Sequence, residues 1–422
     1  MKICAVICEF NPFHNGHAYL LRCAKELSGC DAVMCIMSGN FTQRGEPAIV
    51  DKETRAKMAI LNGADIVVQM PTYFASTNAE VYATTGVKIA NSFANVTHIC
   101  FGSESGDITT IKELATLLAN EPEVFRNQIR KNLNAGYSLG ISKLRAIGDV
   151  IDNGKVIFSH PTEAKKLLDQ PNNILAVEYV KALIKTNSHI VPLTVKILKH
   201  GEKNVNFDIS NGTSIRKSVY QSKRIYNIHK FLPPLAYDAL SETLSKCSVP
   251  NLQKFGTLAL FKLSTSNINA LQQCFDVCEG IENRLVQLAR ENVDFDTFVE
   301  SASSKRFSVN RLKRIVLNCM LDIRDEFVKK IYDLDCLPYV KVLAVRDKSN
   351  VLSGIKDCRC VVVMRKQDVI VAKKDEYARV LMYTEDRANA LFSLLLDLTK
   401  EQKQDLNETS DIYKKPYIDK HK

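Results

Sequence analysis

Four short apolar runs in residues 1–102 do not alternate with polar residues. They are Ile3–Cys8, Ala32–Met37, Ile66–Gln69 and Thr97–Phe101. Strands that are apolar on both faces belong to a sheet covered by helices on both sides, and such sheets are usually parallel. Amphipathic helices are expected between the runs, at Gly16–Leu27, Lys52–Leu61 and Ala79–Phe93. The pattern therefore predicts a doubly wound α/β domain with a parallel sheet.

The pattern changes along the rest of the chain. Residues 107–190 are mostly helical, a further strand is expected at Leu193–Leu198, and another helix starts near Thr213. Residues 225–330 have helical spacing with few strand signals. Two β-branched runs, Val340–Val345 and Cys360–Met364, predict a small α/β module. We expect domains at residues 1–224, 225–335 and 336–400, followed by a polar tail at 401–422.

The composition is that of an ordinary globular protein with a modest basic excess. Hydrophobic residues make up 45% and charged residues 25% of the 422, and the formal net charge is +10. A basic excess favours polyanionic partners, although a basic protein without a nucleic-acid role fits the charge equally well. Whether the basic residues cluster along the sequence has to decide between a polyanionic partner and a basic protein without one.

Thirteen cysteines are scattered along the chain. The N-terminus lacks a signal-peptide pattern, and no apolar run approaches the ~18–20 residues that span a bilayer. We therefore expect reduced thiols in a cytoplasmic protein without a membrane partner. The pairs Cys274–Cys278 and Cys358–Cys360 have no second pair at zinc spacing, so no metal site is expected.

Polar motifs follow three of the four predicted strands where each strand ends. Asn11–His17 (NPFHNGH) follows the first strand, residues 37–47 (MSGNFTQRGEP) follow the second, and Phe101–Glu104 (FGSE) follow the fourth. Ligands of open α/β sheets bind beyond the carboxyl ends of the strands. This coincidence of motif and topology predicts a nucleotide site.

The first of these loops has the chemistry of a phosphate site. Pro12 ends the strand, Gly16 lets the backbone approach a ligand, and the helix that follows offers a positive N-terminus. His14 and His17 are three residues apart, so both can face one phosphoryl group that gains negative charge. The loop predicts ATP binding and attack on the α-phosphate, with His14 and His17 as catalytic residues. Half of a zinc site, or a pair of structural histidines, are the alternatives.

The segment His14–His17 (HNGH) resembles the motif of the HxGH nucleotidyltransferase superfamily, whose members make adenylyl-linked products from ATP. A second signature of that superfamily, Ser/Thr-x-Ile-Arg, is matched by Thr213–Arg216 (TSIR). The resemblance implies that Arg216 holds the β- and γ-phosphates, to which a guanidinium fork is suited. Taken alone, Thr213 would be interpreted as a plain helix cap.

Several longer blocks resemble the tRNA(Met) cytidine acetate ligase family and follow one another in the right order. They are VICEFNPFHNGHAYLL (6–21), residues 37–60, QPNNILAVEYVKAL (170–183), EGIENRL (279–285), SKRFSVNRLKRIV (304–316) and PYVKVLAV (338–345). The resemblance extends from residue 1 to about residue 395. It implies that ATP and acetate give acetyl-adenylate and pyrophosphate, and that the acetyl group then passes to N4 of the wobble cytidine of elongator tRNA(Met).

The resemblance also implies which residues frame ATP, the co-substrate, which would come with Mg²⁺ and without a prosthetic group. In the first strand, loop and helix they are Ile7, Cys8, Glu9, Phe10, Asn11, Pro12, Phe13, Asn15, Gly16, Ala18, Tyr19 and Leu20. Later in the chain they are Gly102, Asn172, Asn173, Lys199, Thr213 and Arg216. Asn172 and Asn173 would equally suit caps of the helix that runs through Leu183.

Three features of the family pattern are changed in this sequence. Lys196 and Lys199 stand where an arginine is usual, and a lysine lacks the bidentate fork. Leu139 stands where the family has a proline, and Asn211 where it has a serine.

A basic helical segment carries Lys305, Arg306, Arg311 and Arg314 next to Phe307. Such a cluster suits an RNA backbone and an unstacked base, so tRNA is expected to bind here, although a solvated basic face is the alternative. Four residues nearer the expected site could serve triphosphate, acid or RNA: Gln43, Arg44, Lys52 and Arg55.

Two other functions share parts of this pattern. A small-molecule adenylyltransferase would need the same first loop but no RNA surface. An RNA-binding protein with a degenerate nucleotide site would fit the departures at Lys196 and Asn211.

Overall fold

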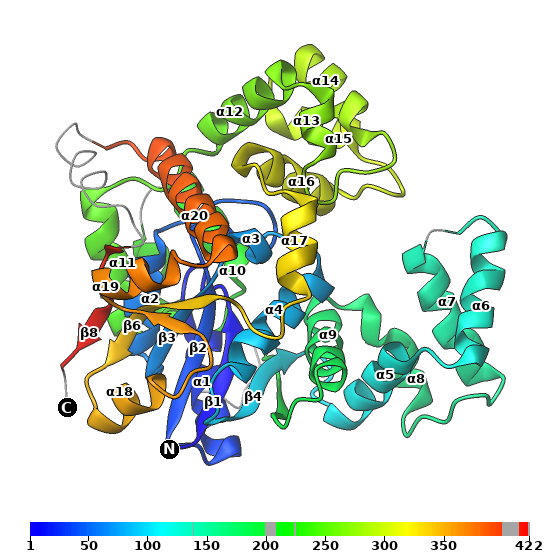
Figure 1. The fold of residues 1–422 in the computed structure, drawn as a ribbon, viewed down its shortest axis with the longest axis horizontal. Helices are drawn as coiled ribbons and strands as arrows, with labels where there is room; N and C mark the ends of the chain where they lie inside the picture. Colours follow the sequence, from blue (N-terminus) through cyan, green and yellow to red (C-terminus); the bar gives the residue numbers. More distant parts are fainter. Residues whose placement is uncertain (138, 199–207, 223–224, 399–412, 421–422) are drawn as a thin grey trace.

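The chain folds around one eight-stranded sheet (Figure 1), seen in a computed structural model that describes residues 1–137, 139–198, 208–222, 225–398 and 413–420. The strand order is β5-β4-β1-β2-β3-β6-β7, with β8 paired to β6. The five strands from β5 to β3 are mutually parallel. They are β1 (Ile3–Cys8), β2 (Ala32–Ser38), β3 (Ile66–Met70), β4 (Val96–Ser103) and β5 (Val191–Lys196). The predicted doubly wound parallel sheet is confirmed.

The strands near the end of the chain extend this same sheet. β6 (Tyr339–Arg346) runs antiparallel to β3, and both β7 (Val361–Val363) and β8 (Tyr417–Asp419) run parallel to β6. The small module predicted at 336–400 therefore contributes strands to the N-terminal sheet. β8 lies within the predicted polar tail and makes that part of the tail a strand. The domain limits themselves stay a prediction.

Helices cover both faces of the sheet, which explains the unbroken apolar runs of its strands. Cys4 and Val6 of β1 pack into the core under α1 (Asn15–Ser28), α2 (Lys52–Leu61) and α11 (Pro234–Lys246). Ile3 and Ala5 point to the opposite face. That face is covered by α4 (Ala79–Asn91), α9 (Pro171–Lys185) and α20 (Glu376–Leu395).

The remaining helices lie at the edges of this sandwich. One group is seen beside α9 on the right of Figure 1, namely α5 (Ile108–Asn120), α6 (Glu123–Asn134), α7 (Leu139–Asp152) and α8 (Pro161–Lys166). Shorter or separate elements are α3 (Thr72–Ala75), η1 (Leu167–Asp169), α10 (Gly212–Ser222), η2 (Tyr226–Phe231), α18 (Ser349–Ile355) and α19 (Lys366–Ala372). The helical character predicted for residues 107–190 is confirmed.

A helical lobe stands at the top of Figure 1 and has a hydrophobic cluster of its own, formed by buried residues between Ala259 and Cys319. Its helices are α12 (Leu252–Thr265), α13 (Ile268–Gln272), α14 (Ile281–Glu291), α15 (Phe295–Ala302) and α16 (Val309–Leu321), and α17 (Asp325–Tyr332) leads back to the sheet. The helices predicted for residues 225–330 are thus confirmed.

The cysteines and the helices bear on the expected thiols and on membrane spanning. All thirteen cysteines are free, as expected for reduced thiols. Of the helices that the structure describes, none is both long and apolar enough to cross a bilayer.

Candidate active site

The strand order reverses between β1 and β4, and in such sheets the crevice at this point is the usual ligand site. The loop after β1 carries Asn11–His17, and the loop after β4 begins at Glu104. The second signature contacts the first of these loops, because Arg216 Nη1 donates a hydrogen bond of 2.7 Å to the carbonyl oxygen of Asn11. The fold therefore brings the predicted nucleotide motifs to one edge of the sheet.

The two histidines form the first turn of α1. His14 is the N-cap, and its Nδ1 accepts a hydrogen bond from the Gly16 N–H at 3.1 Å. His17 Nδ1 in turn accepts from the His14 N–H at 3.2 Å, which completes a capping box built of imidazoles. The rings stack with centroids 3.6 Å apart. A Cβ at residue 16 would lie 3.0 Å from His14 Cε1, so glycine leaves room for the imidazole.

Both histidines are neutral at pH 7. Burial, together with the nearby Arg216 guanidinium, lowers the pKa of His14 to about 4. Burial also lowers the pKa of His17 well below its usual value, with His14 adding to the effect. Because each Nδ1 accepts a backbone hydrogen bond, the proton of each neutral ring is on Nε2. The first turn thus offers two Nε2–H donors beside a helix N-terminus, an arrangement suited to a phosphate.

Nothing in the described residues favours the zinc alternative, because no group of three or more His, Cys, Asp or Glu is placed to hold a metal ion there.

The second signature is rigidly capped. Asn211 Oδ1 accepts from the Ser214 N–H at 2.8 Å and so caps α10. Thr213, which sequence alone would assign to the cap, instead accepts a hydrogen bond from Arg216 Nη2 at 3.2 Å. Asparagine and serine are equally good N-caps, so the departure at Asn211 preserves this structure.

The loop after β4 is clamped to α9. Glu104 accepts hydrogen bonds from the backbone N–H of Asn173 at 2.8 Å and from Asn172 Nδ2 at 2.8 Å. The buried Asn173 Oδ1 accepts in return from the N–H groups of Glu104 and Ser105, at 3.0 and 3.1 Å. The alternative prediction, that the two asparagines cap α9, is wrong, because Glu104 binds the free N–H groups of the first turn.

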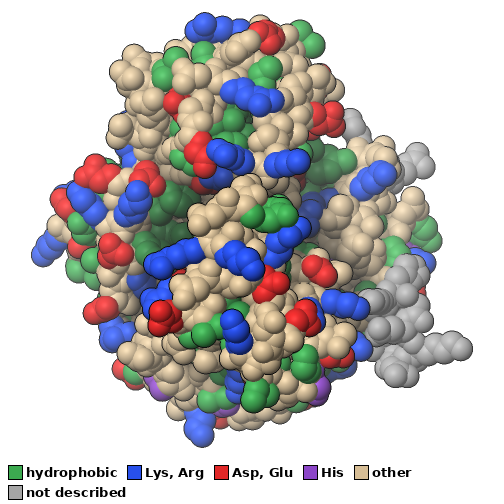
Figure 2. Space-filling view, turned by 90° about the vertical axis from the view of Figure 1, so that its right-hand side faces the viewer, with side chains coloured by type: hydrophobic (Ala, Val, Ile, Leu, Met, Phe, Trp, Pro, Cys, Tyr) green, Lys and Arg blue, Asp and Glu red, His purple; other side chains and the backbone are tan. Residues whose placement is uncertain are grey.

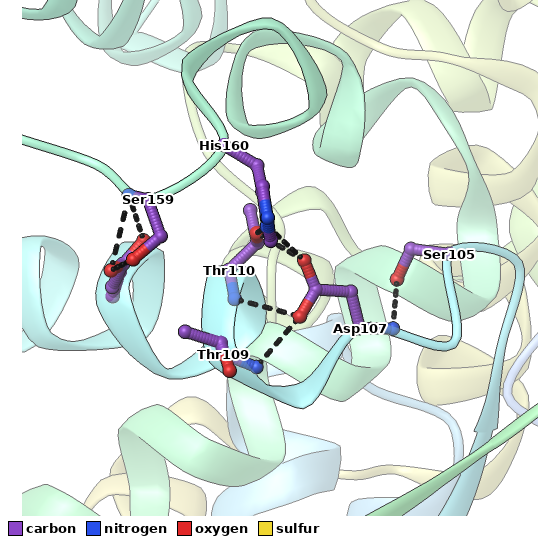
Figure 3. Close-up of polar contacts among 7 residues, drawn as sticks. Ser105, Asp107, Thr109, Thr110, Ser159 and His160 are labelled. Carbon is purple, nitrogen blue, oxygen red and sulfur yellow. Dashed lines mark hydrogen bonds and ion pairs between the residues drawn. The ribbon is translucent and has the colours of Figure 1, made fainter.

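The far end of the same loop is held by Asp107 (Figure 3). Its Oδ1 accepts from the N–H groups of Thr109 and Thr110, and so caps α5. Its Oδ2 lies 2.8 Å from His160 Nδ1, which comes from the segment before α8. The loop from Glu104 to Asp107 is therefore fixed at both ends.

Arg55 binds the backbone of the loops after β1 and β2, a role that the sequence did not predict. Its side chain is fully buried and donates to the carbonyls of Glu9 at 2.6 Å, Val50 at 3.2 Å and Ser38 at 3.3 Å, and also to that of Gly39. It thus holds the ends of β1 and β2 together. The helical pattern around Arg55 gives no signal of this, because the first turn of α2 reads as a charged exposed face.

Burial decides which of the four polar residues near the site can contact a ligand. They are Gln43, Arg44, Lys52 and Arg55. Arg55 and Lys52 are 0% exposed and cannot contact a ligand directly, and Lys52 Nζ lies 3.7 Å from Glu385 of α20. Arg44 is exposed, and the N–H of the half-buried Gln43 donates to Glu9 at 2.6 Å. Only Arg44 and Gln43 remain as candidates for direct contact.

The other expected ATP residues vary in burial. Ile7, Phe10, Pro12 and Phe13 are buried, and the Phe10 ring lies 4.9 Å from that of His17. Asn15 Nδ2 donates to the carbonyls of residues 208 and 230, both at 2.9 Å. Four others are half-buried: Cys8, Ala18, Tyr19 and Leu20.

Gly102 lies on β4, and Lys196 lies on the neighbouring strand β5. Gly102 belongs to β4, and a Cβ there would lie 3.1 Å from Ile197 Cγ1, so the glycine makes room for Ile197. Lys196 is exposed on β5. Lys199 and the side chain of Leu139 lie outside the described residues.

The predicted tRNA-binding cations are partly engaged within the lobe. Arg311 forms a bidentate ion pair with Asp276, with Nη2 at 2.7 Å, and stacks over Phe307. Arg306 pairs with Glu279 at 2.9 Å. The Phe307 ring next to these cations is buried, and Arg311 lies over it, so the ring is not exposed to a base. Figure 2 shows Lys and Arg side chains across the middle of one face, below the lobe.

The loop after β2 connects the site with this lobe. Its tip, Gly45, has φ of +75°, and a Cβ there would lie 2.5 Å from the backbone carbon of Lys313 in α16. The neighbouring Glu46 pairs with Lys313 Nζ at 2.7 Å. The loop is therefore wedged between the nucleotide motifs and α16.

Comparisons with known proteins agree with this geometry. Residues 1–408 match the family described as HIGH Nucleotidyl Transferase. The tRNA(Met) cytidine acetate ligase of Clostridium perfringens is 37% identical over 362 residues, which cover 84% of this chain and 87% of that protein. The chain belongs to the tRNA(Met) cytidine acetate ligase family. The member of this family from Caldicellulosiruptor saccharolyticus is 34% identical over 93% of this chain and 94% of its own.

Two solved structures of Thermotoga maritima TmcAL have the same fold. The form bound with alpha-thio ATP aligns over 100% of both chains with a TM-score of 0.90 and 27% identity. The apo form aligns over the same range with a TM-score of 0.89 and 28% identity. The predicted nucleotidyltransferase fold is confirmed across the whole chain.

Proposed function

We propose that this chain is an ATP-dependent tRNA(Met) cytidine acetate ligase. It activates acetate as acetyl-adenylate with release of pyrophosphate, and then acetylates N4 of the wobble cytidine of elongator tRNA(Met) with release of AMP. One observation carries the proposal: two neutral Nε2–H donors and Arg216 meet at the switch point of the sheet. The names of the relatives support the acid and the acceptor.

In the first step an oxygen of acetate attacks the α-phosphorus, and the bond to the β-phosphate oxygen breaks. His14 and His17 stabilise the charge that develops on the α-phosphate through their Nε2–H groups, together with the N-terminus of α1. Arg216 binds the β- and γ-phosphates. The other ATP contacts come from the residues implied by the family resemblance, between Ile7 and Leu20 and at Gly102, Asn172, Asn173, Lys199 and Thr213.

Mg²⁺ belongs to the proposal as the partner of the ATP phosphates. Magnesium keeps several waters and takes one or two carboxylates besides phosphate oxygens. Water and the ATP phosphates would therefore supply most of its ligands. Mg²⁺ would neutralise phosphate charge and orient the pyrophosphate that leaves.

The tRNA is proposed to bind across α16 and the segment before it, through Lys305, Arg306, Arg311 and Arg314. The seating of the loop tip Gly45 against the backbone of α16 supports this placement, because RNA on the lobe would then lie beside the nucleotide motifs. The exposed Lys305 is the cation most open to a phosphate.

The test is an acylation assay with ATP, Mg²⁺, radiolabelled acetate and total tRNA, followed by nucleoside analysis. Label in N4-acetylcytidine and pyrophosphate exchange that depends on acetate are the expected results. Exchange that is indifferent to acetate and to tRNA would refute the proposal and favour a small-molecule adenylyltransferase. Binding of tRNA without acetylation, unchanged in a His14→Asn, His17→Gln double variant, would instead indicate an RNA-binding protein with a degenerate nucleotide site.

Deleting the C-terminal half is not a useful test of these alternatives. β6 pairs with β3 inside the central sheet, so a chain without it would expose a central strand of the nucleotide domain. Omitting tRNA from the assay separates the two enzyme hypotheses without damage to the fold.

A further inference from the structure

Glu9 stands at the end of β1 as the only carboxylate of the first loop. Its backbone is fixed by Arg55, whose Nη1 donates to the Glu9 carbonyl at 2.6 Å. Its half-buried side chain accepts the Gln43 N–H through Oε1 at 2.6 Å. The second oxygen, Oε2, forms no hydrogen bond with any described residue. The structure thus holds one carboxylate oxygen in place beside the nucleotide motifs and leaves the other available.

A carboxylate is an unexpected neighbour for the first two substrates. ATP and acetate are both anions, and a like charge close to them is repulsive. Burial raises the pKa of Glu9 above its usual value, although the Gln43 N–H and the arginines lower it. The ionisable groups around it from every side are Cys8, Arg44, Arg55, Tyr82, Tyr179 and Arg216. Glu9 is therefore better suited to the third substrate, an amine that loses a proton.

The histidines cannot take that proton in their observed state. His14 Nδ1 accepts the Gly16 N–H, and His17 Nδ1 accepts the His14 N–H. Each neutral ring therefore carries its proton on Nε2 and has no free lone pair on nitrogen. Arginine cannot act as a base in a protein either. Among the ionisable side chains of the first loop, Glu9 alone keeps a basic atom, Oε2, that forms no hydrogen bond with the described part of the chain.

We propose that Glu9 accepts the proton of the cytidine amine during acetyl transfer, an inference that rests on the proposed function. N4 attacks the carbonyl carbon of acetyl-adenylate and forms the new C–N bond. The bond from that carbon to the phosphate oxygen breaks, and AMP leaves with the electron pair. One N4 proton passes to Glu9 Oε2, and from there to water. The products are N4-acetylcytidine, AMP and one released proton.

Glu9→Gln tests this role without disturbing the loop. The amide oxygen of glutamine can still accept the Gln43 N–H, but the side chain can no longer accept a proton. Acetylation of tRNA should fall by about 10²–10⁴-fold, the usual contribution of a general base, whereas the loss of acetate-dependent pyrophosphate exchange should be at least about tenfold smaller. Glu26→Gln, on the exposed surface of α1, removes the same charge elsewhere and should change neither rate.

Pyrophosphate exchange and tRNA acetylation, measured separately, distinguish the possible roles of Glu9. Equal losses of exchange and transfer in Glu9→Gln would place Glu9 in ATP or Mg²⁺ binding and overturn the inference. Transfer at the parental rate would overturn it too. If Glu9→Gln does not fold, Glu9→Asp keeps a carboxylate on a shorter stem, and a selective loss of transfer is again required. Absence of acetate-dependent exchange in the parent enzyme would refute the proposed function and this inference with it.

Discussion

Arg216 Nη1 donates a 2.7 Å hydrogen bond to the Asn11 carbonyl, across 205 residues of sequence. The same guanidinium donates to Thr213 Oγ1 through Nη2. One side chain thus fixes the position of the second signature relative to the first loop. The guanidinium carries further N–H groups that make no hydrogen bond with the described residues and can donate to phosphate oxygens, which a single ammonium group could not match.

Arg216→Lys should therefore weaken ATP use while it preserves the charge. Loss of about 1.5–3 kcal/mol of charge-assisted hydrogen bonding corresponds to a fall in kcat/KM for ATP of roughly 10- to 100-fold. The measurement is acetate-dependent pyrophosphate exchange across a range of ATP concentrations. Lys217→Ala, on the exposed face of the same helix, is the control, and an equal fall in that variant would contradict the assignment.

His14→Asn and His17→Gln should separate the cap from the chemistry. Asparagine at the N-cap can still accept the Gly16 N–H, and glutamine at the third helical position can still accept the His14 N–H. Thermal stability should change little, whereas exchange should fall by about 10²–10³-fold in each variant, since an Nε2–H donor is lost. A drop in stability with unchanged kcat would show that the histidines serve only the helix.

The depressed pKa of His14 predicts a specific acid dependence of stability. Between pH 6.5 and about 4 the unfolded chain binds a proton at residue 14 and the folded chain does not. The free energy of unfolding therefore decreases as pH falls through this window and levels off below it. Urea unfolding of the parent and of His14→Asn at pH 7 and pH 5 should show a smaller decrease in the variant. A titration midpoint near 6.5 for His14, measured by ¹⁵N NMR, would contradict the prediction.

Arg311 and Lys305 should behave differently although both lie in the predicted tRNA-binding segment. Arg311→Met leaves Asp276 without its bidentate partner and should lower stability by about 1–3 kcal/mol. Lys305→Gln removes an exposed cation that forms no hydrogen bond or ion pair with the described residues, so the stability should not change. Its tRNA affinity should fall, with a salt slope smaller by about 0.7–0.9 if one phosphate contact is lost. Filter binding at three salt concentrations measures the tRNA affinity, and thermal unfolding measures the stability. A loss of stability in Lys305→Gln together with unchanged tRNA affinity would show that tRNA binds to another surface.

The sequence was most informative where local pattern and burial coincide. β1 was predicted to its residue limits, and β2 and β3 each extend one residue further than predicted. A strand covered on both faces must be apolar throughout, so its limits are visible in the sequence. The histidine motif is local in the same sense, whereas the first turn of α9 is capped by the distant Glu104.

The remaining features depend on contacts between distant segments. Three examples are the pairing of β6 with β3, the burial of Arg55 and the ion pair of Arg311 with Asp276. The residues next to them in the sequence give no signal of these contacts. A charged residue in a helix reads as exposed unless the tertiary fold places carbonyl or carboxylate oxygens around it. Burial therefore reverses the expectation for Phe307 as well, since the arginine expected to bind RNA covers its ring.

The wedge between the loop after β2 and α16 predicts that Gly45→Ala is unusually harmful. Alanine at φ of +75° is strained by about 1 kcal/mol or more, and its Cβ would lie 2.5 Å from the Lys313 backbone carbon, which cannot rotate away. Gly280, at φ of +77° with nothing within 4 Å of a Cβ, is a matched control for the strain alone. We expect Gly45→Ala to lower stability by a further ~1–3 kcal/mol beyond Gly280→Ala. Equal shifts of the unfolding transition in the two variants would show that the loop moves away from α16 without resistance.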